Sequence, residues 1–161
     1  MSDIKANKPS SKSKFRQGYY KLENLDKYVG DPAKIIYRSS WEHRFCRYCD
    51  LDARVIKWAS EPIGIKYMSP IDGKEHKYYV DFYMRTKIGD RISDILVEVK
   101  PAASLIRPVL EGKKITTKKL QAYNYNLKTW IINKSKFEAA KMYAEGRGYK
   151  FMVVTEDFLF N

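Results

Sequence analysis

Residues 78–100 read YYVDFYMRTKIGDRISDILVEVK, and this stretch decides the predicted fold. On both sides of Gly89-Asp90, apolar side chains alternate with other residues, and many of them are β-branched or aromatic. Such alternation with period two predicts two half-buried strands. Gly-Asp between the strands suits a two-residue hairpin loop with glycine at its first central position. The stretch therefore predicts an antiparallel hairpin centred on Gly89 and Asp90.

The predicted register brings two acids together. Asp81 and Glu98 are equidistant from the loop and face each other, with Cβ atoms about 4.5–5.5 Å apart, where like charges destabilise a sheet. Lys100 lies two residues beyond Glu98 and points to the same face. A pair of carboxylates beside an ammonium group suits a bound Mg²⁺, which prefers oxygen ligands. These three residues are the first candidates for a functional site.

Composition indicates one basic globular domain. The chain has 161 residues, 44% of them hydrophobic, which is enough for a single domain with a real core. Lysine and arginine total 31 against 19 acids, for a formal net charge of +12. We expect residues 1–16, rich in Ser and Lys, to form a flexible basic arm, and residues 17–161 to form the domain. The body is also basic, which favours nucleic acid as partner over a membrane surface; the alternative is that the charge serves solubility.

Two features argue against a membrane or secreted protein. The chain has no run of about 18 apolar residues that would span a bilayer. Its N-terminus also lacks the apolar core of a signal peptide. We therefore expect no membrane partner and no secretion.

A helix is predicted from Ser39 or Ser40 to about Asp50. Ser39 followed by Glu42 three residues later fits a capping box. The helical neighbours of Glu42 are apolar, so its carboxylate would point partly inward, which is uncommon unless it is paired or binds metal. The alternative is that Glu42 only caps the helix by folding back to the backbone. The apolar helical neighbours of Glu42 are Phe45, Cys46 and Cys49.

The other elements follow from local patterns. Residues 54–68 are predicted to form one or two strands interrupted at Pro62, and a turn at Asp72-Gly73 leads into the strand carrying Asp81. After Pro101 comes a basic connector that turns helical around residues 117–127.

The C-terminal part is predicted to hold a further helix and a last strand. Ser135 and Glu138 fit a second capping box that would open this helix, and Gly146 and Gly148 would end it. Residues 151–155 are continuously apolar, as in a strand buried on both faces. The predicted apolar side of the helix consists of Phe137, Ala140, Met142 and Ala144.

This order of elements resembles the PD-(D/E)XK nuclease superfamily, whose core is α-β-β-β-α-β. More closely, the chain is similar to TnsA-type endonucleases and to head completion nucleases of T-even-like tailed phages. The phrases that carry this likeness are YRSSWEHRFCRYCD, VDFYM, VEVKP and KFEAAKMYAEGRGYKFMVVTE, within residues 30–156. Val80 stands where the superfamily name has proline, which shapes backbone rather than chemistry. The resemblance implies an α/β, restriction-endonuclease-like fold with a mixed central sheet flanked by helices.

The resemblance also implies Mg²⁺-dependent hydrolysis of DNA, with Mn²⁺ as a substitute. Asp81, Glu98 and the Val99 carbonyl would bind the metal, which stabilises phosphoryl charge and activates water near neutral pH. Lys100 would orient or deprotonate the attacking water and offset developing charge. Glu42 would hold a metal-bound water or a second ion.

Basic residues after the hairpin are candidates for contacts with DNA phosphates, which position nucleic acid without reading its sequence. Gln121 is an accessory candidate, because Gln121 and Tyr125 match the QxxxY pattern of RecB-type relatives; packing or a surface position is the alternative. The candidate phosphate contacts are Arg107, Lys113, Lys114, Lys118 and Lys119.

The resemblance implies a biological role in phage head–tail joining, in the host cytoplasm during virion assembly. Its partners would be DNA and phage head, portal or neck proteins. Many relatives cut both strands as dimers, although the sequence carries no dimerisation signature. Two alternatives stay open: a non-catalytic DNA-binding head-assembly protein, and a transposase-type or resolvase-type endonuclease.

A zinc site is the weaker alternative for the histidines and cysteines. His43, Cys46 and Cys49, with His76, offer metal-binding side chains. The CRYC segment lies mid-helix, however, with no second CxxC or HxxxH in the chain. The two cysteines are therefore predicted to pack the helix as small apolar residues.

Overall fold

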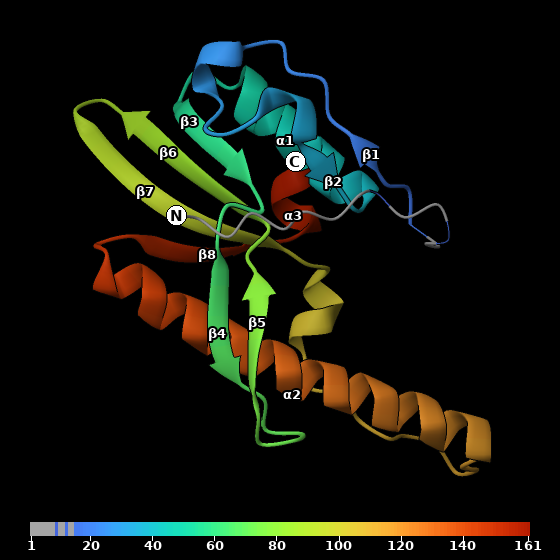
Figure 1. The fold of residues 1–161 in the computed structure, drawn as a ribbon. Helices are drawn as coiled ribbons and strands as arrows, with labels where there is room; N and C mark the ends of the chain where they lie inside the picture. Colours follow the sequence, from blue (N-terminus) through green and yellow to red (C-terminus); the bar gives the residue numbers. More distant parts are fainter. Residues whose placement is uncertain (1–8, 10–11, 13–14) are drawn as a thin grey trace.

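A four-stranded mixed sheet forms the centre of the computed structural model, which describes residues 9, 12 and 15–161 (Figure 1). The strand order is β3-β6-β7-β8; β3, β6 and β7 run antiparallel, and β8 runs parallel to β7. Most of the predicted basic arm, residues 1–16, lies outside the described residues. The predicted mixed sheet flanked by helices is confirmed. The strands are β3 (Val55–Ser60), β6 (Phe82–Ile88), β7 (Arg91–Val99) and β8 (Lys150–Val154).

The central hairpin has the predicted register. Its ladder runs from the pair Phe82–Val97 to the pair Ile88–Arg91, with Gly89 and Asp90 as the loop. Gly89 has a φ of +60°, which glycine adopts without the steric cost that other residues incur. One step beyond the last ladder pair, Asp81 and Glu98 lie at the open end of the hairpin.

The prediction of one continuous strand through Asp81 is wrong. β5 (Glu75–Tyr79) ends before Asp81 and pairs with β4 (Gly64–Met68) as a separate hairpin. The chain bends at Asp81, and the Glu61 N–H donates to the Asp81 carbonyl at 2.8 Å. β4 and β5 therefore leave the central sheet at one corner. The predicted interruption at Pro62 is confirmed, because β3 ends at Ser60 and β4 begins at Gly64.

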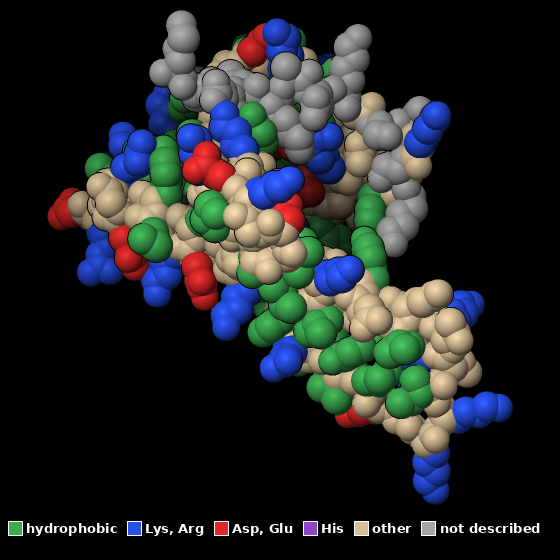
Figure 2. Space-filling view, turned by 60° about the horizontal axis from the view of Figure 1, so that its bottom comes forward, with side chains coloured by type: hydrophobic (Ala, Val, Ile, Leu, Met, Phe, Trp, Pro, Cys, Tyr) green, Lys and Arg blue, Asp and Glu red, His purple; other side chains and the backbone are tan. Residues whose placement is uncertain are grey.

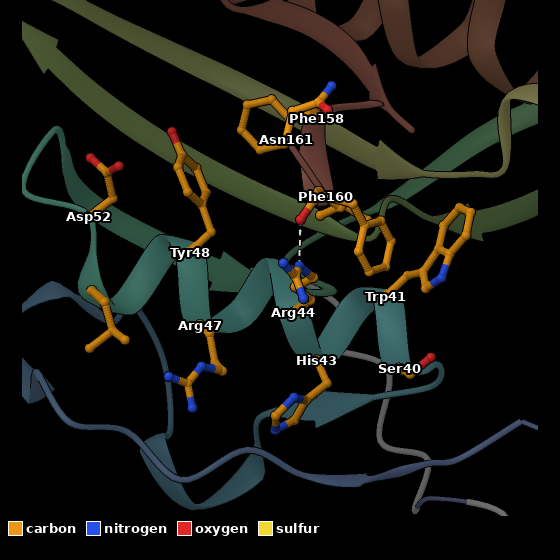
Figure 3. A pocket seen from close by; sticks show the side chains of 12 residues that line it. Ser40, Trp41, His43, Arg44, Arg47, Tyr48, Asp52, Phe158, Phe160 and Asn161 are labelled. Atoms are coloured by element: carbon orange, nitrogen blue, oxygen red, sulfur yellow. Dashed lines mark hydrogen bonds between the residues drawn. The ribbon is translucent and has the colours of Figure 1, made fainter. Parts of the chain in front are cut away.

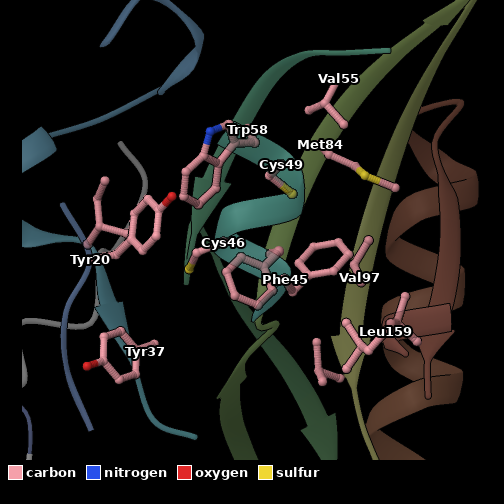
Figure 4. Packing of buried hydrophobic residues seen from close by; sticks show 14 residues of the cluster. Tyr20, Tyr37, Phe45, Cys46, Cys49, Val55, Trp58, Met84, Val97 and Leu159 are labelled. Carbon is pink, nitrogen blue, oxygen red and sulfur yellow. The ribbon is translucent and has the colours of Figure 1, made fainter. Parts of the chain in front are cut away.

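Helix α1 (Ser40–Leu51) covers one face of the sheet. The Ser39 side chain caps it by accepting from the Glu42 N–H at 3.1 Å. Phe45, Cys46 and Cys49 are fully buried in the core between α1 and the sheet (Figure 4). The prediction that the two cysteines pack the helix as small apolar residues is therefore confirmed.

Helix α2 (Thr117–Gly146) covers the opposite face and is a single 30-residue helix. The predicted new helix start at Ser135 is wrong, because residues 117–145 contain no Gly or Pro that would end the first helix. The predicted apolar side is wrong at Met142, which is 74% exposed. The helix ends at the predicted glycines: Gly148 has a φ of +71°, and the Tyr149 N–H donates to the Ala144 carbonyl at 2.8 Å, as in a Schellman motif.

The two faces of the sheet carry separate cores. Val97 and Val99 belong to the core under α1, whereas Leu96 packs with Ala140 and Ala144 of α2. Side chains alternate along a strand, so Glu98 points to the same face as Leu96. The β4–β5 hairpin packs against α2 on this same side (Figure 1).

The prediction that the last strand is buried on both faces is wrong. β8 is an edge strand of the sheet and most of its residues are half-buried, with Val154 fully buried. No helix in the described part of the chain is long and apolar enough to cross a membrane. The remaining short elements are β1 (Gly18–Tyr19), β2 (Ile36–Tyr37), α3 (Glu156–Leu159) and the 3₁₀ turns Leu25–Lys27, Pro32–Lys34 and Ala102–Leu105.

Candidate active site

Asp81 and Glu98 meet where β7 ends. The Val99 N–H donates to Asp81 Oδ2 at 2.8 Å, which holds the Asp81 side chain against the backbone next to Glu98. Glu98 is 4% exposed. The structure therefore brings together the two acids that the hairpin register predicts.

Lys100 completes this group. Its Nζ lies 3.1 Å from Glu98 Oε1, so both side chains point to the same face as predicted. The Lys100 N–H donates to the Val154 carbonyl at 2.9 Å, which extends the pairing of β7 with β8. The other oxygen, Glu98 Oε2, is buried and has no hydrogen-bond partner. A buried acceptor without a partner costs roughly 1–3 kcal/mol, and more when it is charged.

Glu42 reaches the group from the first turn of α1. Its Oε2 accepts from the Arg38 N–H at 2.7 Å, and its Oε1 lies 3.4 Å from the Ser39 hydroxyl. The carboxylate thus folds back to the backbone, as the capping alternative predicts. It also lies within electrostatic reach of Asp81 and Lys100. The structure places Glu42 beside the acids while its carboxylate is engaged as a cap.

Burial and mutual repulsion make the acids hard to ionise. Burial, followed by the charge of Asp81, raises the pKa of Glu42 to about 7. Burial, followed by the charge of Glu98, raises the pKa of Asp81 to about 7. Burial also raises the pKa of Glu98, although Lys100 opposes this. Burial by itself would lower the pKa of Lys100, but Asp81 and Glu98 raise it above its ordinary value, so Lys100 is held as an ammonium ion.

The donor set fits a hard cation only in part. Within residues 9, 12 and 15–161, no three His, Cys, Asp or Glu side chains are grouped so that they could hold a metal ion. The three predicted carboxylates are therefore not preassembled, because Glu42 is turned to the Arg38 amide. The buried Oε2 of Glu98 beside Asp81 nevertheless provides two carboxylates of the kind that Mg²⁺ prefers.

The structure does not assemble the zinc alternative. His43 contacts the rings of Tyr20 and Tyr37, with centroids 5.6 and 4.7 Å away. His76 lies on the β4–β5 hairpin, 2.7 Å from Asp72.

The predicted phosphate contacts lie along the connector and the first turn of α2. All are exposed. The four lysines lie near the start of α2, at the end that projects beyond the sheet (Figure 1), whereas Arg107 lies beside the middle of the helix, 5.9 Å from the centre of the Trp130 ring. Figure 2 shows hydrophobic and basic side chains on this projecting part. In the connector that precedes α2, Ile106 and Val109 are 71% and 70% exposed. The predicted phosphate contacts are Arg107, Lys113, Lys114, Lys118 and Lys119.

Gln121 does not come near the acids. It is exposed on the second turn of α2, and Tyr125 is 72% exposed. A rise of 1.5 Å per residue places Gln121 about 22 Å along the helix from Lys136, which is the α2 residue within electrostatic reach of Glu98. The residues of the QxxxY pattern therefore lie on the surface, which was the alternative to an accessory role in the site.

Sequence reasoning missed Lys136 and Tyr78. The Lys136 Nζ lies 5.6 Å from the centre of the Tyr78 ring and 5.7 Å from that of Tyr67. The charge of Lys136 lowers the pKa of Glu98, and burial followed by the charges of Glu98 and Asp81 raises the pKa of Tyr78. The spacing Lys136, Ala140, Ala144 could have revealed the lysine, but only with α2 read as one helix.

A pocket of about 870 Å³ lies elsewhere, on the outer side of α1 (Figure 3). Trp41, Arg44 and Arg47 line it together with the C-terminal residues, and the Arg44 Nε donates to the Leu159 carbonyl. None of the predicted catalytic residues lines this pocket.

Comparison with known proteins finds two endonuclease or nuclease matches. A family model described as TnsA-like endonuclease N terminal matches residues 52–156, which include Asp81, Glu98 and Lys100. The chain is also 35% identical over 142 residues to the Head completion nuclease of Enterobacteria phage T4, covering 88% of this chain and 92% of that protein. The family match spans the whole sheet that carries the acids.

Proposed function

Because the chain belongs to the TnsA-like endonuclease family, we propose that it is a Mg²⁺-dependent endonuclease that hydrolyses phosphodiester bonds in DNA. We propose further that it cuts phage DNA at the head–tail joining step, in the cytoplasm of the host, with head, portal or neck proteins as partners. The similarity to a protein named head completion nuclease supports this narrower role.

The observation that carries the proposal is the buried Oε2 of Glu98, which has no hydrogen-bond partner and lies beside Asp81. A protein that used this fold only for structure would gain stability by replacing one of the two acids. Retaining both, with Lys100 at 3.1 Å from Glu98, is reasonable when a cation is to be held between them.

The proposed mechanism divides the roles among four side chains and one backbone carbonyl. Asp81, Glu98 and the Val99 carbonyl would hold Mg²⁺, which when bound stabilises charge on the phosphoryl oxygens and lowers the pKa of water. Lys100 stays protonated near neutral pH, so it donates a hydrogen bond to the attacking water or to a phosphate oxygen and is not the base. Glu42, with a pKa of about 7, accepts a proton from water at neutral pH.

The exposed basic residues of the connector would hold the DNA backbone. Arg107, Lys113, Lys114, Lys118 and Lys119 lie in a segment whose one acid is Glu111. Such contacts give affinity and register without sequence preference. We propose that they position the DNA so that one phosphodiester reaches the acids.

Plasmid cleavage with Mg²⁺ tests the proposal. We expect the wild type to nick or linearise the plasmid, EDTA to stop cleavage, and Glu98→Gln and Lys100→Met to lose roughly a hundredfold or more in rate. Asp94→Asn is the matched control, because Asp94 lies on the same strand and face as Glu98 but pairs with Arg85 at 2.8 Å. It should cut at close to the wild-type rate. A wild type that binds DNA but never cuts with Mg²⁺ or Mn²⁺ would favour the non-catalytic assembly role.

A further inference from the structure

Lys136 brings a second ammonium group to the acids from α2. Lys136, Ala140 and Ala144 follow one another at intervals of four residues and therefore lie on one face of the helix. Ala140 and Ala144 are fully buried, so this face packs against the sheet and the β4–β5 hairpin. One turn before Ala140, the same face carries the half-buried Lys136.

Two tyrosines of the β4–β5 hairpin hold the Lys136 side chain. The ring centres of Tyr67 and Tyr78 lie 6.0 Å apart in an edge-to-face arrangement, and the Lys136 Nζ lies within 6 Å of both. Cation–π contacts of this kind position an ammonium group without removing its positive charge. The side chain is therefore ordered, and its charge still acts on its surroundings.

Tyr78 and Lys136 form one side of the site, and both side chains carry hydrogen-bond donors. The Tyr78 hydroxyl is buried and has no hydrogen-bond partner. Glu98 lies within electrostatic reach of Lys136 as well as of Lys100. Lys100 is paired to Glu98 from β7, so Glu98 is under the influence of one ammonium group from the sheet and of another from α2. An anion that approaches the acids would therefore meet Lys136 on the side of α2.

We propose that Lys136, positioned by Tyr67 and Tyr78, binds a phosphate group of the DNA backbone next to the bond that is cut. The inference rests on the proposed function, and it names a substrate contact that α2 and the β4–β5 hairpin build together. Lys136 is half-buried and held by two rings, whereas the basic residues of the connector are exposed. By holding this neighbouring phosphate, Lys136 should help to position the bond that is cut as well as contribute to overall affinity.

The test separates binding from cleavage. Binding of a 20-base-pair duplex is measured in EDTA across a range of KCl concentrations, for the wild type, Lys136→Met, Lys136→Gln and Lys136→Arg. Both neutral variants should reduce the slope of log Kd against log salt by about one, and the arginine variant should restore it. In Mg²⁺, the neutral variants should cut at least tenfold more slowly at saturating DNA. Lys141→Met, an exposed lysine on the same helix, is the control and should change neither quantity.

The outcomes distinguish the two proposals. If the wild type cuts and the neutral variants match it in salt slope and cleavage rate, Lys136 has only a structural role and the inference is wrong. If the wild type does not cut but the neutral variants still lose one unit of slope, the phosphate contact stands and the nuclease proposal fails. Thermal unfolding of each variant checks that it is folded. If one of the two neutral variants does not fold, the other still tests the inference.

Discussion

Replacing Asp81 with asparagine should stabilise the metal-free protein while abolishing cleavage. The carboxylate of Asp81 is held against the Val99 N–H at 2.8 Å, and asparagine keeps an oxygen that can accept this bond. The substitution removes the charge that Glu98 repels. Residues that bind a metal are often unfavourable for the fold without it, so a gain in stability with a loss of activity is expected.

The size of the gain follows from the pKa of Asp81, which rises from 3.8 to about 7 on folding. Between these values the folded state keeps a proton that the unfolded state has lost, so the free energy of unfolding falls as pH rises. Each unit of pKa is worth about 1.4 kcal/mol, and three units give about 4 kcal/mol. Asp81 is half-buried and solvent screens part of this effect, so we expect about 2–4 kcal/mol at pH 8.

Urea unfolding in EDTA at pH 4, 6 and 8 measures this difference. Asp81→Asn and the wild type should be about equally stable at pH 4, and the variant should be more stable at pH 8. Asp94→Asn is the control, and it should lower the stability at pH 8 instead of raising it. Hydrogen bonds from Arg85 lower the pKa of Asp94, so the ionised Asp94 stabilises the fold above the ordinary pKa of the acid. Equal stability of Asp81→Asn and the wild type at pH 8 would refute the electrostatic reasoning.

Three further predictions concern the framework that positions the site. Phe45→Ala removes a fully buried ring that lies 4.8 Å from Phe82, and urea unfolding should show a loss of about 3–5 kcal/mol; a loss below 1 kcal/mol would contradict the packing. Gly148→Ala meets no neighbouring atom but must adopt a φ of +71°, so it should cost about 1–2 kcal/mol in the same assay, whereas Gly146→Ala, with no positive φ, should not. Asp50→Ala leaves the N–H groups of Glu23 and Asn24 without their acceptor, so hydrogen exchange at these two amides should become faster; unchanged protection would exclude Asp50 as their anchor.

The sequence by itself determined the features that depend on neighbouring residues. Alternation and the Gly-Asp loop specify the register of β6 and β7, because a slip of one residue would turn every apolar side chain to the wrong face. That register is enough to predict that Asp81, Glu98 and Lys100 meet. The cap at Ser39 is equally local, since the serine and Glu42 are three residues apart.

Only the tertiary structure decided which segments from elsewhere join this hairpin. The chain breaks at Asp81, whose carbonyl accepts from the N–H of the distant Glu61, and β5 pairs with β4 instead of extending β6. The Ser135 pattern failed because a local cap motif cannot start a helix inside one that nothing has ended. Lys136 reaches Glu98 only because α2 continues unbroken and packs Ala140 and Ala144 on the sheet. Such contacts join segments far apart in the chain, so their energies depend on packing that local patterns do not encode.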